Sequence, residues 1–279
     1  MGIRDRFAVD GRTALVTGAA SGLGLAYAEA MAEAGAAVTL ADIDADGAER
    51  EAARLRAEGY EARAASCDVS SFADVAAAFD GHVAAYGGLD ICFANAGIDT
   101  GAGFWNPGGF RNPEGQVDTY DPERWNRSIA VNLNGVFYTV SNAVRAMKQE
   151  GRANGRSGGS IICTASNAGF VTEPIVGLPY MPAKAGVLHM VRALGLELAE
   201  FRIRINAIAP GPFVTNIGGG WLKKDPSARA AWDAIVPLGK LAEPEQIKPL
   251  ALLLASDASD YMTGSHVVID GGMMLGKYK

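Results

Sequence analysis

The chain of 279 residues is poor in cysteine and contains no apolar run long enough to cross a membrane. Its cysteines, Cys67, Cys92 and Cys163, are odd in number, lack metal-ligand spacing and lie in apolar segments. They predict neither a disulfide framework nor a metal site, and they favour a reducing, cytoplasmic location. No stretch approaches the roughly 18 uninterrupted apolar residues of a membrane helix, and the first twenty residues resemble no signal peptide. We therefore expect a soluble protein with no membrane partner.

Clustered positive charge is also missing from the chain. The net charge is -6, the isoelectric point is about 5.2 and the basic residues are scattered, which argues against a nucleic-acid partner. The histidines, His82, His189 and His266, lie far apart in helical or strand-like contexts, so we expect structural roles for them. Hydrophobic residues make up 49% of the chain, which is enough for a large core in one domain covering residues 1–279.

Short apolar segments alternate with helical patterns along most of the chain. Such segments are typical of parallel strands that are covered on both faces, and right-handed crossovers then place helices on both sides of the sheet. The sequence thus predicts an α/β fold, a single doubly wound Rossmann domain of about seven parallel strands. The predicted strands are Thr13–Thr17, Ala37–Ala41, Ala62–Cys67, Ile91–Ala94, Ser160–Thr164, Ile203–Ile208 and Val267–Ile269.

Two long segments, residues 98–122 and 212–237, interrupt this alternation. Loops longer than about 12 to 15 residues in a compact domain are usually functional or disordered, and aromatic residues argue against disorder. We expect both segments to border a substrate site. The apolar residues that could contact a substrate there or nearby are Phe104, Trp105, Phe170, Ile175, Val176 and Trp221.

A glycine-rich turn follows the first predicted strand, in the order Thr17-Gly18-Ala19-Ala20-Ser21-Gly22-Leu23-Gly24. Glycines permit a tight turn and a close approach of a ligand to the backbone. The amides of the turn and of the helix that follows can bind a pyrophosphate. Because the turn joins a strand to a helix near the start of the chain, it predicts a dinucleotide site rather than an ordinary turn.

An acidic residue, Asp42, ends the second predicted strand about 20 residues after the glycine turn. A carboxylate at this place can accept hydrogen bonds from both hydroxyls of an adenosine ribose and would repel a 2′-phosphate. The turn from Gly18 to Gly24 also lacks the Arg or Lys that a 2′-phosphate needs. NAD is therefore predicted over NADP. Asp42 could instead cap the next helix, although Asp44 is the better candidate for that.

Tyr180 and Lys184 are four residues apart, so a helix places the phenol and the ammonium group on one face. A phenol has an unperturbed pKa near 10, and a nearby positive charge favours its ionised form. The pair is suited to exchanging a proton with an alcohol or ketone at neutral pH. Alone it could be an ordinary surface contact, but Ser166 upstream and the nucleotide turn favour a catalytic role.

Further short motifs follow in a fixed order: Cys67-Asp68-Val69, Asn95-Ala96-Gly97, Asn132-Leu133-Asn134-Gly135, Ser166-x2-Gly169, Asn206-Ala207-Ile208-Ala209-Pro210-Gly211 and Asp270-Gly271-Gly272. With the glycine turn and Tyr180-x3-Lys184, they resemble the motifs of the short-chain dehydrogenase/reductase family in its single-domain, NAD-dependent form. The resemblance covers nearly the whole chain. Six or more motifs in the right order make a chance match negligible, whereas function follows from a fold less directly.

The resemblance implies four catalytic residues. Tyr180 would be the general acid/base, and Lys184 would lower its pKa and hold the nicotinamide ribose. Ser166 would orient the substrate oxygen, and Asn132 would position a water that relays the proton outward. The implied cofactor-binding residues, besides Tyr180 and Lys184, are Gly18, Ser21, Gly22, Leu23, Gly24, Asp42, Ile43, Asp68, Val69, Asn95, Ala96, Gly97, Pro210, Gly211, Phe213 and Thr215.

The chain departs from the family pattern at two places near the implied site. Ser166 lies 14 residues before Tyr180, where the family commonly has 13, so Asn167 occupies the commoner spacing, although Gly169 aligns better with Ser166. The segment from Ile98 to Trp125 is about a dozen residues longer than we expect for the family. It could be a lid in which Phe104 and Trp105 cover an apolar substrate, or it could be a contact with another subunit or a solvated excursion of the chain.

The leading functional interpretation is an NAD-dependent oxidoreductase that interconverts a secondary alcohol and its ketone by direct hydride transfer. The apolar candidates favour a hydrophobic, cyclic substrate such as a terpene alcohol, a hydroxysteroid or a ring dihydrodiol. There are two alternatives. The protein could be an NAD-binding sensor without turnover, or it could be a sugar-nucleotide epimerase or dehydratase. The complete catalytic set argues against the sensor, and the short C-terminal part against the epimerase. The resemblance also implies a homotetramer, with an apolar stripe along the helix of Lys184 between subunits.

Overall fold

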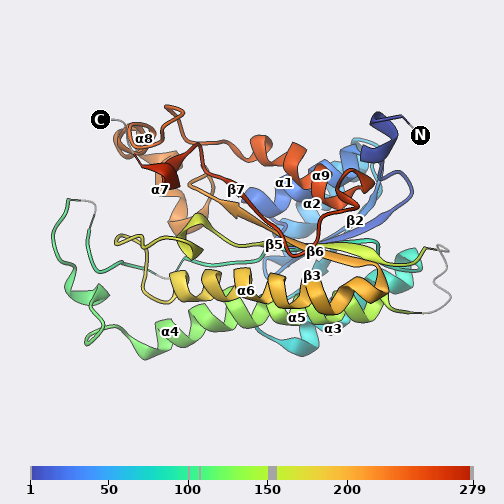
Figure 1. The fold of residues 1–279 in the computed structure, drawn as a ribbon, viewed down its shortest axis with the longest axis horizontal. Coiled ribbons are helices and arrows are strands. Elements are labelled where there is room, and N and C mark those ends of the chain that lie inside the picture. The colour runs from blue at the N-terminus through green and yellow to red at the C-terminus, as the bar shows by residue number, and fades with distance from the viewer. Residues whose placement is uncertain (1, 100, 107, 150–155, 277–279) are drawn as a thin grey trace.

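Seven parallel strands form the single sheet of this computed structural model, which describes residues 2–99, 101–106, 108–149 and 156–276. The strand order is β3-β2-β1-β4-β5-β6-β7. This arrangement confirms the predicted doubly wound α/β domain with about seven strands (Figure 1). The strands are β1 Thr13–Thr17, β2 Ala37–Asp42, β3 Ala62–Ser66, β4 Ile91–Ala94, β5 Gly159–Thr164, β6 Ile203–Pro210 and β7 His266–Ile269.

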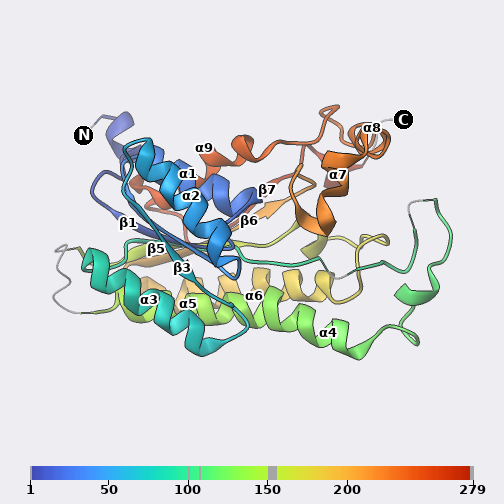
Figure 2. The same cartoon turned by 180° about the vertical axis from the view of Figure 1, so that it is seen from behind.

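Helices cover both faces of the sheet. The helices α1 (Gly22–Glu33), α2 (Ala45–Ala57) and α9 (Lys248–Ala255) lie on one face, and α3 (Phe72–Tyr86), α5 (Gly135–Met147) and α6 (Tyr180–Leu198) lie on the other (Figure 1). The view from behind shows α2 and α3 on opposite sides of the edge strand β3 (Figure 2). Each face has its own hydrophobic core, because side chains of the central strands alternate between the two layers. Among the described residues, no helix is long and apolar enough to cross a bilayer.

The chain direction across the sheet reverses between β1 and β4, which are neighbours although two strands separate them in sequence. From β1 the chain moves outward through β2 and β3, and from β4 it moves the other way through β5 and β6. Connections after β1 and β4 therefore diverge, which leaves a crevice at the carboxyl ends of these strands. The elements that follow them, the glycine turn and residues 95–99, form its walls.

The first long segment lies between β4 and α4 (Pro122–Ile129) and forms an arm, defined here as the described residues of 101–121. Figure 1 shows the arm projecting from the body of the protein beside α4. It folds back on itself, since the amide of Asn106 donates to the carbonyl of Phe110 at 2.9 Å and that of Asn112 to Phe104 at 3.0 Å. It is also tied to the body, because the amide of Trp105 donates to the carbonyl of Pro174 at 3.0 Å.

The second long segment, residues 212–237, is more regular than the sequence suggests. It contains two short helices, α7 (Trp221–Lys224) and α8 (Pro226–Asp233). Asp225 caps α8 by accepting hydrogen bonds from the amides of Ser227 and Ala228. A small separate core lies within and just after this segment. Its buried residues are Val214, Leu222, Val236 and Leu241.

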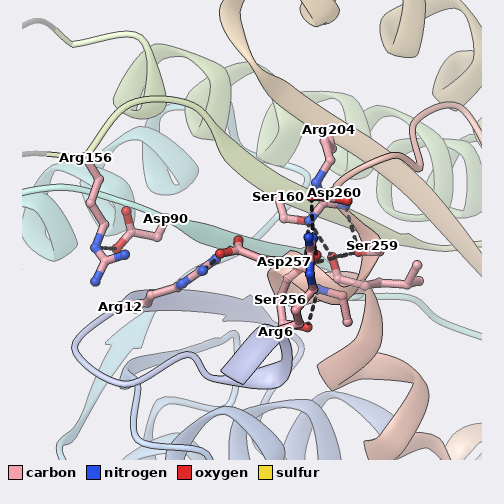
Figure 3. A network of polar contacts seen from close by, with 12 residues as sticks. Arg6, Arg12, Asp90, Arg156, Ser160, Arg204, Ser256, Asp257, Ser259 and Asp260 are labelled. Atoms are coloured by element: carbon pink, nitrogen blue, oxygen red, sulfur yellow. Dashed lines mark hydrogen bonds and ion pairs between the residues drawn. The ribbon is translucent and has the colours of Figure 1, made fainter. Parts of the chain in front are cut away.

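A polar network lies at the other end of the sheet, at the amino ends of the strands (Figure 3). Arg204 on β6 donates to the carbonyls of Leu254 and Ser256, both at 3.1 Å, and to the hydroxyl of Ser259 at 2.9 Å. The guanidinium group thus adds donors to carbonyls at the end of α9, which also accept from the hydroxyls of Ser160 and Ser259. The network adjoins a cavity of about 930 Å³.

Ion pairs complete the same network. Arg6 bonds to Asp260 and Arg12 to Asp257, each at 2.7 Å (Figure 3). These four side chains join the beginning of the chain to the turn after α9, and at least three of them are substantially exposed, so each pair contributes little by itself. We therefore assign the cavity beside them a structural role, with the half-buried Arg204 as its centre.

Replacing Arg204 with methionine keeps the apolar stem but removes the hydrogen bonds of the guanidinium group to the carbonyls of Leu254 and Ser256 and to the hydroxyl of Ser259. We expect the free energy of unfolding to fall by roughly 2 to 4 kcal/mol. Urea unfolding followed by circular dichroism measures the change. Arg202→Gln is the matched control, because Arg202 is exposed nearby, and it should change stability by less than about 0.5 kcal/mol. Equal effects of the two substitutions would contradict the assignment.

Candidate active site

A cleft of about 780 Å³ lies at the carboxyl ends of the strands, where the chain direction reverses. Of the residues that the sequence assigned to catalysis, Ser166, Tyr180 and Lys184 line it. All predicted cofactor residues line the same cleft: Gly18, Ser21, Gly22, Leu23, Gly24, Asp42, Ile43, Asp68, Val69, Asn95, Ala96, Gly97, Tyr180, Lys184, Pro210, Gly211, Phe213 and Thr215. Residues from six of the sequence motifs, together with Asp42, are thus brought to one place.

The glycine turn packs so closely against the chain after β4 that side chains are excluded from two of its positions. A Cβ atom on Gly18 would lie 2.7 Å from the Cα of Ala96, and Gly18 has a φ of +69°. A Cβ atom on Gly24 would collide with the carbonyl of Gly18. Helix α1 then begins at Gly22, and its first residue is preceded by Ser21, whose side chain does not cap the helix. The amides at this helix terminus therefore remain directed at the cleft, as an anion site requires.

Asp42, the last residue of β2, is held beside the glycine turn. One of its carboxylate oxygens accepts a hydrogen bond from the amide of Ala20 and the other from the amide of Asp44, both at 2.9 Å. Asp44, rather than Asp42, caps α2, since its side chain accepts from the amide of Gly47 at 3.0 Å. The structure thus supports the choice that the sequence made between the two carboxylates.

Tyr180 and Lys184 lie on the first turn of α6, as their spacing predicts. The Lys184 Nζ is 5.5 Å from the centre of the Tyr180 ring and donates to the carbonyl of Thr164 at 2.8 Å. Pro182 is tolerated because it lies in the first turn, where its missing amide has no partner to lose. The sheet thereby fixes the ammonium group at the end of β5, beside the phenol.

Ser166, not Asn167, is the residue that reaches Tyr180. Its hydroxyl hydrogen-bonds the phenol and also accepts from the amide of Ala168 at 3.1 Å. The helical turn Asn167–Gly169 that follows absorbs the extra residue in the spacing. Asn167 lies nearby and lines the cleft as well, with its Nδ2 4.0 Å from the Sδ of Met273.

The catalytic groups have shifted acidities because they are buried. Burial lowers the pKa of Lys184 to about 8. Burial also raises the pKa of Tyr180; a hydrogen bond with Ser166 lowers it, and the charge of Asp99 raises it further. The sequence predicted that Lys184 would lower the pKa of Tyr180, but in the protein alone the net shift is upward. The reason is that desolvation of the phenol outweighs the favourable contacts, and burial also reduces the charge on Lys184 itself.

Asn132, the fourth predicted catalytic residue, does not line the cleft. It is fully buried in a π-helical turn, Ala130–Asn134, which joins α4 to α5. Its Oδ1 accepts from the amide of Ile98 at 3.0 Å and its Nδ2 donates to the carbonyl of Ile98 at 3.1 Å. Such π-turns are frequent at functional sites. Here the side chain holds the segment that leads from β4 into the arm, and its role in a proton relay stays a prediction.

The substrate end of the cleft differs from the expectation in several positions. Of the predicted apolar residues, Ile175 and Val176 line it, whereas Phe104, Trp105 and Phe170 do not, and the side chain of Trp221 lies outside the described part of the structure. The hypothesis that Phe104 and Trp105 form the wall of a lid therefore lacks support from the geometry. Cys67, Leu222 and Trp232, which lie in segments that the sequence pointed to, also line the cleft. Lining residues that the sequence did not single out are Ser70, Ile98, Asp99, Gly101, Arg127, Ala130, Val131, Thr164, Ala165, Ala168, Glu173, Pro212, Asn216, Ile217 and Met273.

Comparison with known proteins assigns the chain to a family. A family model described as enoyl-(acyl carrier protein) reductase, of the short-chain dehydrogenase/reductase type, matches residues 18–274. The chain belongs to the short-chain dehydrogenase/reductase family. The three motifs that carry Asn132, Ser166, Tyr180 and Lys184 all lie within the matched range.

Relatives of this dehydrogenase/reductase act on different alcohols. A cis-4-hydroxycyclohexanecarboxylate dehydrogenase of Sinomonas cyclohexanicum is 37% identical, over 94% of this chain and 96% of the relative. A sorbose reductase of Candida albicans is 34% identical, over 97% and 89%. The crystal structure of a gluconate 5-dehydrogenase from Burkholderia cenocepacia, in complex with NADP and tartrate, has a TM-score of 0.84 at 33% identity and covers 98% of this chain and 99% of its own. The protein is therefore an oxidoreductase that acts on CH–OH groups and uses a nicotinamide cofactor.

The cleft fits such a cofactor. The close packing of Gly18 leaves a backbone-lined cradle at the helix terminus, and a Cβ atom on Gly22 would meet nothing nearer than Thr215, at 3.5 Å, so the turn is open on the ligand side. Asp42 stands at the ribose position implied by the family, beside the turn. Pro210, Gly211 and Phe213 border the other end, near the catalytic pair.

The lowered pKa of Lys184 has a consequence for stability. Its folded value of about 8 lies below the ordinary 10.5, so between these pH values the unfolded chain binds more protons and stability rises with pH. Below about pH 8 the folded protein carries the full penalty of a buried charge. In Lys184→Met this penalty is absent, so the variant should gain stability over wild type at pH 7 by an amount on the order of 3 kcal/mol more than at pH 10.

Urea unfolding of both proteins between pH 7 and pH 10 measures this difference. Tyr180 titrates in both, so its contribution largely cancels in the comparison. The loss of the hydrogen bond to Thr164 shifts the whole curve without changing its slope. A difference that stays constant across this pH range would mean that Lys184 keeps its ordinary pKa.

Proposed function

We propose that the protein is an NAD-dependent dehydrogenase that interconverts a secondary alcohol and its ketone, with Tyr180 as the general acid/base. The observation that carries the proposal is the convergence of Tyr180, Ser166 and Lys184 at one end of a cleft whose other end is a pyrophosphate cradle. A sensor without turnover has no need of this proton-transfer set.

The protein's part in the reaction follows from these three side chains. Ser166 and Tyr180 share a hydrogen bond, so both can direct their hydroxyls at one substrate oxygen. Tyr180 takes the proton from the alcohol or returns it to the ketone. Lys184, fixed by Thr164, supplies positive charge beside the phenolate. The bound nicotinamide would supply the hydride acceptor or donor, and Lys184 would also hold its ribose.

The preference for NAD rests on the charge of Asp42. The carboxylate is anchored by the amides of Ala20 and Asp44, so it cannot easily move away from a 2′-phosphate. Among the described lining residues the cations are Arg127 and Lys184, and neither follows β1 or β2, where a 2′-phosphate would lie. The NADP in the gluconate 5-dehydrogenase structure is a property of that relative.

The substrate we propose is hydrophobic and cyclic, of the terpene alcohol, hydroxysteroid or ring dihydrodiol class. Apolar walls support it, since Ile175, Val176, Leu222, Trp232 and Met273 line the cleft. The cyclohexane ring in the name of the Sinomonas relative agrees with this class, whereas sorbose, a sugar, shows that related clefts also admit polyhydroxylated molecules. We propose a cyclic, hydrophobic substrate rather than a sugar because the substrate end of this cleft is lined mainly by apolar side chains.

We further propose a cytoplasmic homotetramer. The stripe on α6 that suggested a subunit contact is part of the core, because Val187, Leu188 and Val191 are buried within the chain. Exposed apolar residues elsewhere on the same layer, Phe137 on α5 and Leu196 on α6, are better candidates for the contact. The cysteines are all free and buried, which suits a reducing compartment.

Tyr180→Phe removes the proton donor but keeps the ring and its packing. We expect kcat for cyclic secondary alcohols to fall by at least about 100-fold, while NAD binding is unchanged. Absorbance of NADH measures turnover, and calorimetry measures NAD binding. The control is Tyr261→Phe, since Tyr261 is fully exposed. Wild-type binding of NAD without turnover of any alcohol would instead favour the sensor.

Asp42→Asn removes the negative charge and keeps the size of the side chain, although only one oxygen remains to accept from the amides of Ala20 and Asp44. The preference for NAD over NADP, measured as the ratio of the two kcat/KM values, should fall at least about tenfold, mainly through a lower KM for NADP. Asp44→Asn is the matched control, because Asp44 caps α2 and does not line the cleft. If the ratio stays the same in Asp42→Asn, the carboxylate does not select the cofactor.

A further inference from the structure

Glu173 is a carboxylate in the cleft that the catalytic set does not use. It lies seven residues before Tyr180, in the loop that leads into α6, and it lines the cleft together with Ile175 and Val176. Its side chain has no hydrogen-bond or ion-pair partner among the described residues, yet its oxygens are not sealed from solvent. A half-buried carboxylate of this kind has acceptor capacity that a ligand can fill.

The position of Glu173 is fixed from two sides. Its amide donates to the Sδ of Met181 on α6 at 3.3 Å, and its carbonyl accepts from the amide of Val176 at 3.1 Å. The next carbonyl, of Pro174, accepts from Trp105 on the arm at 3.0 Å. The backbone that carries the carboxylate is therefore held between the catalytic helix and the arm, as a specific binding group requires.

The surroundings decide which ligand group fits. Burial raises the pKa of Glu173, with no cation contributing, so a donor that satisfies the carboxylate must come from elsewhere. The charge of Asp99 acts at the same end of the cleft, where it raises the pKa of Tyr180. Besides Glu173 and Asp99, the cleft lining includes the cations Arg127 and Lys184, so positive charge is not in excess and an anionic substrate gains no net attraction. A neutral hydroxyl suits an otherwise apolar wall better than an ammonium group, whose desolvation is expensive.

We propose that Glu173 accepts a hydrogen bond from a second hydroxyl group of the substrate, so that the enzyme selects cyclic diols over mono-alcohols and over hydroxy acids. This inference rests on the proposed function, because Tyr180 and Ser166 take the first hydroxyl. Glu173 is then a specificity-determining residue at the far side of the ring. The apolar wall between the two polar groups contacts the ring itself.

The test compares wild type with Glu173→Leu and Glu173→Gln on a panel of 1,2-, 1,3- and 1,4-cyclohexanediols. Cyclohexanol and 4-methylcyclohexanol are the mono-alcohol references, and 4-hydroxycyclohexanecarboxylate is the acid. In Glu173→Leu, kcat/KM for the best diol should fall roughly tenfold to a hundredfold, since a hydrogen bond to a charged group is lost. The mono-alcohols should be unchanged or improved, and the acid should improve. Glu173→Gln, which keeps an acceptor, should lie between wild type and Glu173→Leu on the diol.

Thr172→Val is the control, because Thr172 is exposed on the same loop and does not line the cleft. It should leave the ratio of diol to mono-alcohol kcat/KM as in wild type. An equal loss on diol and mono-alcohol in Glu173→Leu, or no loss on any diol, would overturn the proposal, because a merely structural role moves both substrates together.

A binding measurement separates this proposal from the proposed function. Calorimetric titration of the NADH-loaded protein with the diols and with 4-methylcyclohexanol measures binding without turnover, because NADH cannot accept a hydride from an alcohol. Tighter binding of a diol that Glu173→Leu abolishes would uphold the role of Glu173 even if no alcohol were oxidised, in which case only the proposed activity would fail. Equal binding of diol and mono-alcohol by wild type would reject the role of Glu173 whatever the activity.

Discussion

The structure around the cleft depends on one side-chain amide, that of Asn95, which joins the carboxyl ends of three strands. Its Nδ2 donates to the carbonyl of Thr17 at the end of β1 at 3.0 Å, and its Oδ1 accepts from the hydroxyl of Thr164 at the end of β5 at 3.1 Å. The carbonyl of Thr164 in turn accepts from Lys184. Cofactor cradle and catalytic pair are thus linked by consecutive hydrogen bonds, and each buried polar group in the chain has its partner in the next.

This linkage explains why the site motifs could be predicted from the sequence, whereas the residues that line the substrate end of the cleft could not. Gly18, Asn95 and Lys184 occupy positions where backbone approach or a buried hydrogen bond admits few residue types. The strands were predicted because both of their faces are buried, which gives short apolar runs; β6 continues to Pro210, past the predicted end at Ile208, because its pairing with β7 continues there. The helices α7 and α8 are too short for a periodic pattern, so their residues seemed irregular.

The pKa shifts of Tyr180 and Lys184 could not be predicted from the sequence for a related reason. A spacing of four residues places a phenol and an ammonium group on one face, but it does not say how much water either retains. Burial shifts the pKa of Tyr180 upward and that of Lys184 downward, so each neutral form gains at the expense of the charged one. The ordinary pKa values of the two groups are similar, so these opposite shifts separate them and make the ammonium group of Lys184 the stronger acid of the pair in the protein alone. A ligand that carries negative charge near Lys184 would then restore its positive charge.

The arm contributes Gly101 to the lining of the cleft and otherwise acts on its substrate end through the loop before α6. Gly103 approaches the chain at Pro174 and Ile175 so closely that a Cβ atom would collide with their backbone, and Ala102 pairs with Val176. The arm therefore positions the loop that carries Glu173 and Ile175. The side chains of Phe104 and Trp105 do not line the cleft. Extra residues after β4 thus pack against the segment before α6, and the described aromatic residues among them do not line the cleft. Under our proposal, selectivity depends on the side chains that this segment presents, which are two apolar residues and one carboxylate.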